Sequence, residues 1–473
     1  MKTYQDFKVA VEKGQMLDFI SQAISEHRSS DAFRTALDAD EYEAQRNVTI
    51  SKWAKYLYTM TGQKVADFTA SNNRLANNLF HRLNTQRLAY SLGNGISFTN
   101  TEKTVVDGKE TTIDTTKEAL GKTFDTRIYK AGLFSLIHGL SFLFWNNDRI
   151  DVFKLTEFVP LWDEETGMLK AGIRFWSLDW NHKPVTVVLY EEDGYTKLRT
   201  KGDNTAMELQ IIEPKRAYKQ KIASSVAEGE VVVDEINYSK FPIVPLWGSR
   251  KHQSTLVGMR GKLDAFDLIC SGFADDLQDC AEIYWILEND MGDGDADLAK
   301  FRDKLKLNHI ANIDGNNTKI TPYTQEIPTA ARTQFLTEIR NQIYEDFGAL
   351  DVHTVAAGAT NDHIDAAYQP MDEEADDFEM QIIETLTQIL ELMGIDDTPI
   401  FKRNRISNQA EQTNMVLMAA DHLDEETILN KLPFITVDEV SDILARKTAE
   451  NDTFGAGVEQ FEEGTEGLEG AEA

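Results

Sequence analysis

The chain has 473 residues, 41% of them hydrophobic, and a formal net charge of −31. This length and composition predict a folded protein of roughly two to four domains. The charge argues against a protein whose main task is to grip phosphates, because affinity for a duplex comes largely from Lys and Arg. A surface along which nucleic acid passes without being held needs little positive charge, so that possibility stays open.

Segment 1–19 carries acidic residues where a secretory signal would need a basic start and an unbroken apolar run, so we expect no standard export. The most apolar segment, 131–145, is too short to cross a bilayer and contains His138, and we interpret it as buried structure. Cys270 and Cys280 lie ten residues apart on one predicted helix, too far for a mutual disulfide. We therefore expect reduced thiols in a core.

The first part of the chain, about 1–90, has a helical pattern, with an Asn-rich segment from Thr69 leading into regularly spaced leucines. From about 150 to 246 the pattern changes to short apolar runs separated by turn signals, which predicts antiparallel strands. Pro242 and Pro245 then predict a stiff extended connector, because each proline biases its predecessor away from helix.

A long helix over about 254–286 is predicted after the connector. Its apolar residues recur at alternating steps of four and three, which is the pattern of a coiled-coil seam. A seam this narrow suits a helix that packs lengthwise against other helices, whereas a helix on a broad core has a wider apolar stripe. A buried helix inside one domain is the alternative. The seam residues are Met259, Leu263, Phe266, Cys270, Phe273, Leu277 and Cys280.

A small α/β insert is predicted next, with a short helix at 298–305 and strands at 309–313 and 320–324. Pro328 opens a second long helix, whose apolar residues recur every four positions until Gly348 provides a stop. The insert is therefore flanked by two long helices.

The small, flexible segment 351–361 precedes a third long helix over about 372–393, and a loop between long helices is a candidate functional projection. Near the end, Thr436 and Glu439 form a capping box that predicts the last helix of a small helical domain. Segment 451–473 contains seven acidic residues, five glycines and no Lys or Arg, so we expect disorder there.

The sequence offers no recognisable catalytic or metal-binding motif. Residues 119–123 look like the end of a phosphate-binding loop, but a threonine stands where the first glycine belongs. No His or Cys pair has zinc spacing, and the aspartates of 293–297 lack the Gly and Glu of a calcium loop. Asp275, Asp276 and Asp279 could be imagined as nuclease carboxylates, yet we interpret them as a solvated helix face opposite the seam. We expect no enzyme, no metal and no cofactor.

One basic cluster stands out against the acidic background, in the short helix of the insert. It could dock an acidic partner or touch DNA, and a solvated helix face is the alternative. The cluster consists of Lys300, Arg302, Lys304 and Lys306.

The order of the predicted elements resembles that of the portal proteins of long-tailed DNA bacteriophages over nearly the whole chain. The segments that carry the resemblance are Phe158-Val-Pro-Leu-Trp-Asp-Glu-Glu-Thr-Gly before Ala171-Gly-Ile-Arg-Phe-Trp, Leu189-Tyr-Glu-Glu-Asp-Gly-Tyr, Phe241-Pro-Ile-Val-Pro-Leu, and Asp424-Glu-Glu-Thr-Ile-Leu with Leu432-Pro-Phe-Ile. The chain departs from the family pattern at Gly248, Ser249 and Arg250, where members often carry an Asn pair.

The resemblance implies an α+β, mainly helical fold with a wing, a long-helix stem, a small α/β clip and a helical crown around a central tunnel. On this sequence the implied regions are a wing at 1–250, a first stem helix at 251–283, a clip at 284–327, a second stem helix at 328–349, a tunnel loop at 350–363, a long wing helix with a return strand at 364–405, a crown at 406–450 and an acidic tail at 451–473. Stem helices of adjacent subunits would pack side by side, which is what a heptad seam permits.

The resemblance also implies a ring of identical subunits, usually a dodecamer, at one capsid vertex of the virion, assembled in the bacterial cytoplasm. Its partners would be the terminase large subunit, the head–tail adaptor, the major capsid and scaffold proteins, and dsDNA that passes through without sequence specificity; no membrane is implied. His353, Thr354 and Asn361 are the polar residues expected to face the tunnel, and the basic cluster of the clip would dock a partner.

Two other functions stay open. A capsid-associated structural protein without a tunnel would have the same composition, and oligomer geometry would distinguish it from a portal. A packaging ATPase and nuclease would need the intact phosphate loop and carboxylate metal site that the sequence lacks.

Overall fold

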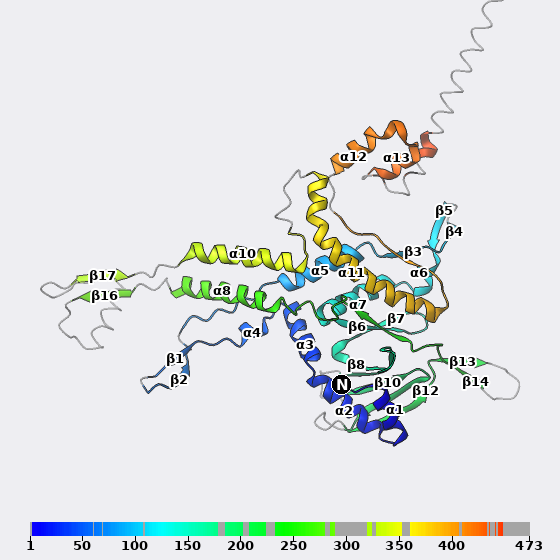
Figure 1. Cartoon of the computed structure of the whole chain (residues 1–473), viewed down its shortest axis with the longest axis horizontal. Helices are drawn as coiled ribbons and strands as arrows, with labels where there is room; N and C mark the ends of the chain where they lie inside the picture. Colours follow the sequence, from blue (N-terminus) through cyan, green and yellow to red (C-terminus); the bar gives the residue numbers. More distant parts are fainter. Residues whose placement is uncertain are drawn as a thin grey trace, which may run out of the picture. The chain divides into compact units, whose positions relative to one another are not determined.

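The structure is a computed structural model that describes residues 2–59, 61–68, 70–106, 109–177, 185–201, 208–223, 232–279, 284–288, 319–323, 328–351, 360–405, 409–432, 435, 440 and 443–447. The chain divides into two compact units: unit 1 comprises Met1–Ala349 and Glu373–Arg403, and unit 2 comprises Leu350–Asp372 and Asn404–Ala473. Unit 1 combines helices with antiparallel sheets (Figure 1), which confirms the predicted α+β class.

Helices open the chain, as the pattern of the first segment predicts. Thr3 and Asp6 form a capping box at the first of them, and Ser30 caps the third. They are α1 (Tyr4–Glu12), α2 (Met16–Ser29), α3 (Asp31–Glu43) and α4 (Val48–Ser51).

The helical prediction for 1–90 is wrong at the β1–β2 hairpin, which consists of β1 (Tyr56–Tyr58) and β2 (Lys64–Ala66). Gly62 turns the chain between the strands at φ 77°, a conformation that favours glycine. Aromatic and β-branched residues in the two runs favour strand over helix. A further helix of the segment, α5 (Leu79–Leu92), begins after the Asn-rich stretch.

A five-stranded antiparallel sheet occupies the range in which strands are predicted. Successive residues of a strand point to opposite faces. Val187 and Leu189 therefore pack with the residues of α1 and α2, whereas Val188 and Tyr190 lie in a second apolar cluster. The sheet order is β12-β11-β10-β9-β8, with the bounds β8 (Phe158–Trp162), β9 (Leu169–Trp176), β10 (Thr186–Glu191), β11 (Gly194–Thr200) and β12 (Leu209–Arg216).

A three-stranded sheet, β15-β6-β7, pairs the connector with the most apolar segment of the chain. Every residue of β6 is buried, and the helix before it is buried over most of its length, so segment 131–145 is buried structure as predicted. A Cβ at Gly248 would lie 2.2 Å from the Ser135 carbonyl oxygen, so only glycine fits at this position without a shift of the backbone. The bounds are α7 (Phe124–His138), β6 (Leu140–Trp145), β7 (Ile150–Lys154) and β15 (Ile243–Trp247).

The largest apolar cluster of unit 1 joins α5, α7 and the later part of α11 (Asn361–Met393). That helix begins well before its predicted start near residue 372. Ile364, Tyr368 and Met371 are buried in unit 2 at helical spacing, and Pro370 lies inside the helix rather than before it. The smaller elements of unit 1 are β3 (Ile96–Phe98), β4 (Thr101–Val106), β5 (Lys109–Asp114), α6 (Thr115–Leu120), β13 (Lys219–Ala223), β14 (Val232–Ile236) and β18 (Pro399–Phe401).

Unit 2 contains short helices in the range predicted to be helical. Asp424 caps one of them by accepting a hydrogen bond from the Thr427 backbone N–H at 3.0 Å. The helices are α12 (Gln409–Met418) and α13 (Glu425–Lys431). The predicted capping box at 436–439 and the acidic tail at 451–473 lie outside the described residues.

Asp397 holds the return strand β18 beside β3. Its carboxylate accepts hydrogen bonds from the backbone N–H groups of Thr99 at 3.0 Å and Asn100 at 3.2 Å, and from the Thr116 hydroxyl at 2.5 Å. Burial opposes the charged form, but the hydrogen bonds from Thr116 and Thr99 outweigh it and lower the pKa of Asp397 to about 2. A carboxylate with a lowered pKa contributes stability above its ordinary pKa, and this contribution is lost as the pH falls toward 2.

We expect Asp397→Asn to lower the free energy of unfolding by about 1 kcal/mol at neutral pH, a magnitude reduced for the solvent screening of an exposed carboxylate. The difference from wild type should shrink between pH 4 and pH 2, because the wild-type carboxylate then becomes protonated. Urea denaturation at pH 7, 4 and 2.5 measures this. A difference that stays constant over the three pH values would contradict the assignment.

Candidate functional site

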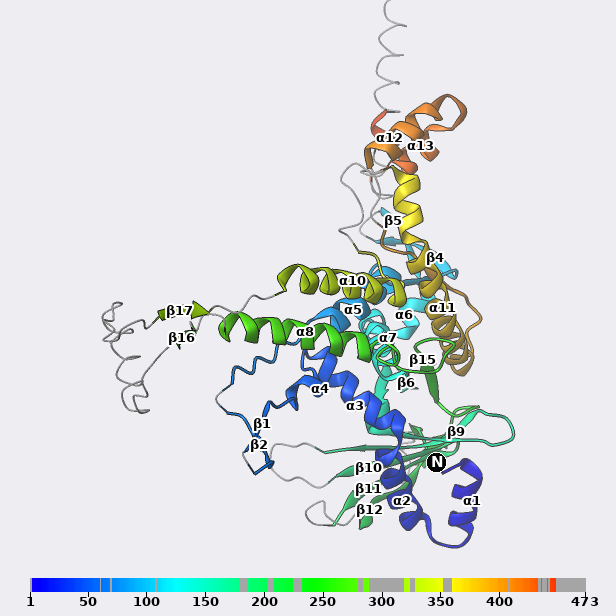
Figure 2. The same cartoon turned by 60° about the vertical axis from the view of Figure 1, so that its left-hand side comes forward.

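Two long helices, α8 (Arg260–Asp279) and α10 (Thr329–Phe347), run side by side away from the sheets of unit 1 (Figures 1 and 2). An ion pair between Lys262 and Asp346 joins the start of α8 to the end of α10, and one between Asp276 and Arg332 joins the other ends. The helices are therefore antiparallel. Beyond them, β16 (Tyr284–Glu288) pairs with β17 (Lys319–Tyr323).

The helix predicted over 254–286 is thus too long at both ends. Gly258 has φ 87°, a conformation that interrupts a helix, and residues 255–259 form turns. At the other end, the aromatic and β-branched run of β16 favours a strand and finds a partner in β17. Of the seam residues that the structure describes, Leu263 to Leu277 lie in α8 and Met259 lies in the turn before it.

The seam residues differ in burial along α8. Met259 and Leu263 are buried with Ile343, Tyr344 and Phe347 of α10 in one apolar cluster of unit 1, which leaves them no surface for a neighbour. Phe266, Cys270 and Phe273 are half-buried, and Leu277 is 54% exposed. Cys280 lies outside the described residues. The outer half of the seam therefore has exposed surface that a neighbouring chain could contact.

A second face of α8 carries a row of polar acceptors, Asp267, Ser271 and Asp275, all of them buried. The Asn-rich segment lies along this row. The backbone N–H of residue 77 donates to Asp267 at 2.9 Å, that of residue 75 to Ser271 at 2.9 Å, and that of residue 73 to Asp275 at 2.6 Å. Four helical residues rise about 6 Å and two extended residues span nearly the same length, so the two spacings match. We call this arrangement the α8 ladder.

Side-chain amides and a lysine complete the α8 ladder. Asn47 and Asn77 donate through their Nδ2 atoms to Asp267 at 2.9 and 2.6 Å, and Lys55 forms an ion pair with Asp275 at 2.9 Å. Burial dominates at Asp267 and raises its pKa. Burial also acts on Asp275, but the hydrogen bonds from Asn73 and the Lys55 ion pair outweigh it and lower the pKa of Asp275.

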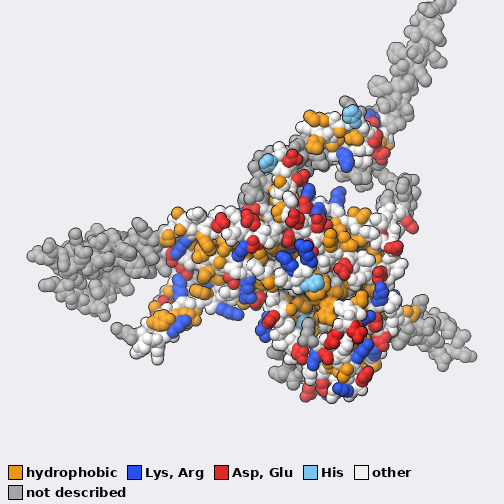
Figure 3. Space-filling model, viewed as in Figure 1, with side chains coloured by type: hydrophobic (Ala, Val, Ile, Leu, Met, Phe, Trp, Pro, Cys, Tyr) orange, Lys and Arg blue, Asp and Glu red, His pale blue; other side chains and the backbone are white. Residues whose placement is uncertain are grey.

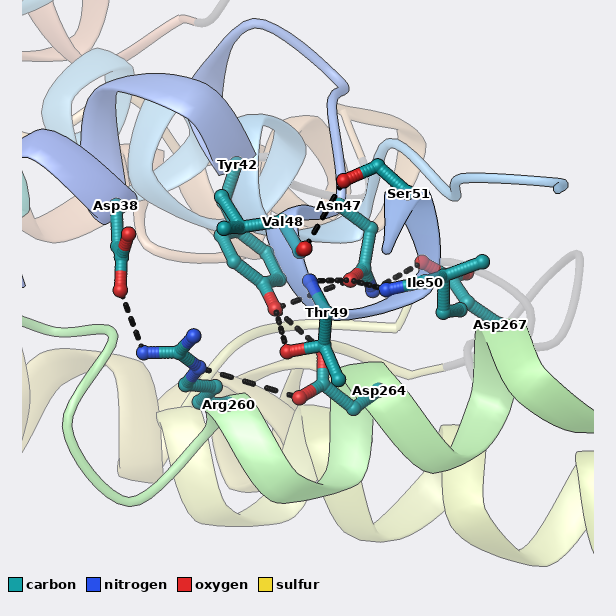
Figure 4. A network of polar contacts seen from close by, with 10 residues as sticks. All are labelled: Asp38, Tyr42, Asn47, Val48, Thr49, Ile50, Ser51, Arg260, Asp264 and Asp267. Atoms are coloured by element: carbon teal, nitrogen blue, oxygen red, sulfur yellow. Dashed lines mark hydrogen bonds and ion pairs between the residues drawn. The ribbon is translucent and has the colours of Figure 1, made fainter. Parts of the chain in front are cut away.

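The base of α8 is fixed to the amino-terminal helices by a polar network (Figure 4). Arg260 pairs with Asp38 of α3 at 2.6 Å, and the Tyr42 hydroxyl donates to Asp264. Burial, together with the hydrogen bond to Asp264, raises the pKa of Tyr42 to about 12, so this hydroxyl remains a donor at neutral pH. Asn47 caps α4 through its Oδ1 atom, which accepts from the backbone N–H groups of residues 49 and 50.

The carboxylates of α8 do not form the uniformly solvated face that the sequence suggests. Asp275 is 4% exposed and is held in the α8 ladder, and Asp276 pairs with Arg332 of α10. The interpretation was wrong because the covering segment lies about two hundred residues away in the chain. Alternating acceptors and an Asn-rich segment were the available signals, and neither identifies its partner without the fold.

The basic cluster of the insert, at 300–306, and the tunnel residues His353 and Thr354 lie outside the described residues. Asn361 is the first residue of α11, so the predicted loop at 350–363 ends in helix. Residues 115–120, at the imperfect phosphate loop, form the helix α6, whose N-cap is Asp114. Residues 119–123 therefore join the end of α6, where Gly121 is the C-cap, to the start of α7, where Thr123 is the N-cap, as expected for the alternative of a helix start or loop.

Within the described ranges, no group of three His, Cys, Asp or Glu side chains could hold a metal ion. The described helices also include none that is long and apolar enough to cross a membrane.

The model of the family "Phage portal protein, SPP1 Gp6-like" matches residues 22–453. The chain belongs to the phage portal protein family. Among curated portal proteins, that of Bacillus phage SPP1 is 23% identical over 426 residues, covering 82% of this chain and 78% of the relative. The portal protein of Clostridium phage phiCD119 is 26% identical over 216 residues, covering 44% of this chain and 48% of the relative.

A solved structure titled "Neck of empty GTA particle computed with C6 symmetry" covers 74% of this portal-family chain and 88% of its own, with 8% identity and a TM-score of 0.43.

Proposed function

We propose that the chain is the portal subunit of a DNA bacteriophage, a component of the virion that forms a ring at one capsid vertex. The observation that carries the proposal is the family match along residues 22–453. In this proposal the ring is a dodecamer with a central tunnel, through which dsDNA enters during packaging and leaves during ejection. The ring assembles in the bacterial cytoplasm with the major capsid and scaffold proteins.

The α8–α10 pair is the stem in this proposal, and the sheets with the surrounding helices are the wing. An antiparallel pair tied at both ends by ion pairs is a stiff element that can stand beside the same element of a neighbour. The insert at 284–327, which includes β16 and β17, is the clip, where the terminase large subunit and later the head–tail adaptor would dock. Within unit 2, residues 350–363 are the tunnel loop and residues 406–450 are the crown.

The acidic composition agrees with a conduit. A net charge of −31 repels the phosphate backbone, so DNA can slide through without being held. In this proposal the packaging energy comes from the terminase, because residues 119–123 lack the first glycine that a phosphate-binding loop needs. A capsid-associated protein without a tunnel is the other candidate, and no observation on this chain favours it.

A packaging test distinguishes these functions. The phage structural and terminase genes are expressed with and without the gene for this chain, and the DNA protected from nuclease inside the particles is measured. We expect capsids in both cases and protected DNA only when the chain is present. Equal amounts of protected DNA in the two preparations would contradict the conduit role.

A further inference from the structure

The β1–β2 hairpin belongs to an arm, residues 52–74, that leaves α8 and returns to it. Both ends are tied to one carboxylate, because Lys55 pairs with Asp275 at 2.9 Å and the Asn73 backbone N–H donates to it at 2.6 Å. The root of the arm is thus fixed, while the hairpin itself lies away from the apolar clusters of unit 1.

The arm exposes an unusual amount of apolar surface for a chain with a mean hydropathy of −0.40. Tyr58 is 73% exposed and Phe68 is 93% exposed. An isolated two-stranded hairpin is at best marginally stable in water, so a partner that covers these side chains would also stabilise the hairpin. The exposed apolar residues of the arm are Trp53, Tyr56, Leu57, Tyr58, Val65 and Phe68.

The charge of the arm is opposite to that of the rest of the chain. Residues 52–74 contain four basic residues and one acidic residue, hence a net charge of +3 within a chain of −31. Hydrophobic and basic side chains gather over this hairpin in Figure 3. A second copy of this acidic chain therefore complements the positive charge of the arm, which an uncharged partner would not do.

Three of the four basic residues of the arm already have partners within the chain, which favours a protein over a nucleic acid as the occupant. Lys55 is paired with Asp275, the Lys64 ammonium lies 3.9 Å from the centre of the Tyr56 ring, and Arg74 donates to the Ser51 carbonyl at 2.9 Å. Duplex binding depends on cations that reach phosphates, whereas a protein partner can use the aromatic surface.

A ring also dictates where the partner surface lies. A closed ring uses two different surfaces of each subunit, one for each neighbour. The hairpin and α10 lie on opposite sides of α8 in Figures 1 and 2. The outer side of α10 exposes an apolar residue followed by two acidic ones, in a stripe with steps of three, four and three: Phe335, Glu338, Gln342 and Glu345.

We propose that the arm of one copy docks on this α10 stripe of the next copy around the ring. The aromatic side chains of the arm cover Phe335, and Lys52 and Lys64 face Glu338 and Glu345. The inference rests on the proposed function, because it needs a ring, and it adds a joint between neighbouring stems that the sequence seam does not supply.

Cross-linking tests the joint directly. Tyr58→Cys and Phe335→Cys are combined in a chain that also carries Cys270→Ser and Cys280→Ser, and a flexible bismaleimide reagent is added to the assembled ring. We expect a ladder of covalently linked subunits on a denaturing gel for the double variant. Each single variant should stay monomeric on the gel, because the two sides of the joint use different residues. A monomer band alone from the double variant would overturn the proposal.

The protein concentration needed for ring formation tests how strongly the joint stabilises the ring. The double variant Tyr58→Ser with Phe68→Ser should keep the wild-type circular dichroism spectrum and need about tenfold more protein for half-maximal ring formation. Met168→Ser, which changes an exposed apolar residue elsewhere in unit 1, should assemble as wild type. Wild-type assembly of the double variant would overturn the joint. So would intact rings that lose only duplex DNA binding, because the arm would then be a DNA contact.

The two failures are distinguishable. If the wild-type chain never forms rings, the proposed function fails and the joint with it. If wild-type rings form but neither the ladder nor the assembly defect is seen, only the joint fails.

Discussion

Asp267→Ala should lower the free energy of unfolding by about 3 kcal/mol, because a buried acceptor of three hydrogen bonds is lost at once. The Asp267 side chain is 2% exposed, and the Asn77 backbone N–H and the Asn47 and Asn77 amides donate to it at 2.6 to 2.9 Å. Without it these donors have no partner at the root of the arm. The unfolding free energy is measured by urea denaturation at pH 7.

The effect should also be local. Limited proteolysis should cut within residues 52–78 faster in Asp267→Ala than in wild type, because the Asn-rich segment is released from the α8 ladder. Asp276→Ala is the matched control on the same helix. Its carboxylate is 32% exposed and pairs with Arg332, so its loss should cost no more than about 1 kcal/mol. Equal destabilisation by the two variants would contradict the ladder.

Arg87→Leu should lower the free energy of unfolding by roughly 3 kcal/mol, because it removes a buried guanidinium and leaves the backbone carbonyl that it contacts without a donor; the carboxylate that it pairs with is 39% exposed and stays solvated. Arg87 of α5 is 6% exposed. Its Nη2 atom donates to the Phe347 carbonyl at 2.5 Å and pairs with Glu374 at 3.1 Å, and its guanidinium lies 4.3 Å from the centre of the Phe347 ring. One side chain thus joins α5, the end of α10 and α11.

Arg82→Leu is the matched control for that change, because Arg82 is exposed on the same helix. Its replacement should alter the free energy of unfolding by no more than about 0.5 kcal/mol. Thermal unfolding followed by circular dichroism compares the two variants. A Tm of Arg87→Leu equal to that of Arg82→Leu would show that the buried contacts of Arg87 contribute nothing.

The sequence predicts local features of this fold well where a pattern repeats along one segment. The steps of four and three from Met259 predict a helix, and the structure has α8 there. Short apolar runs separated by turn signals predict the strands around Leu189, which pair in the five-stranded sheet. Periodicity reports which face of an element is apolar, and this information survives folding.

The sequence does not reveal contacts between segments that are distant in the chain. Asp275 has the pattern of an exposed helix residue, and only the fold brings Lys55 and Asn73 onto it. The sequence does not predict the β1–β2 hairpin, because Gly62 and a short aromatic run are weak local signals beside long helices. A polar residue on a helix looks the same in the sequence whether its side chain forms hydrogen bonds with water or with a second segment of the chain.

The seam residues also combine a prediction that the structure confirms with contacts that only an assembled ring would show. The seam predicts lengthwise packing, and part of that packing is with α10 of the same chain. The outer residues Phe273 and Leu277 are the ones with surface left for a neighbour. Their contacts in a ring stay a prediction, as do those of the basic cluster at 300–306 and the tunnel loop.

The most direct test of the account is the oligomeric state of the purified chain, measured by native mass spectrometry with negative-stain imaging of the same sample. The account predicts one closed ring with a central hole and the mass of a dodecamer or a near neighbour of it. A monomer or dimer at every concentration, also with scaffold protein added, would contradict the portal ring and favour a capsid-associated protein without a tunnel.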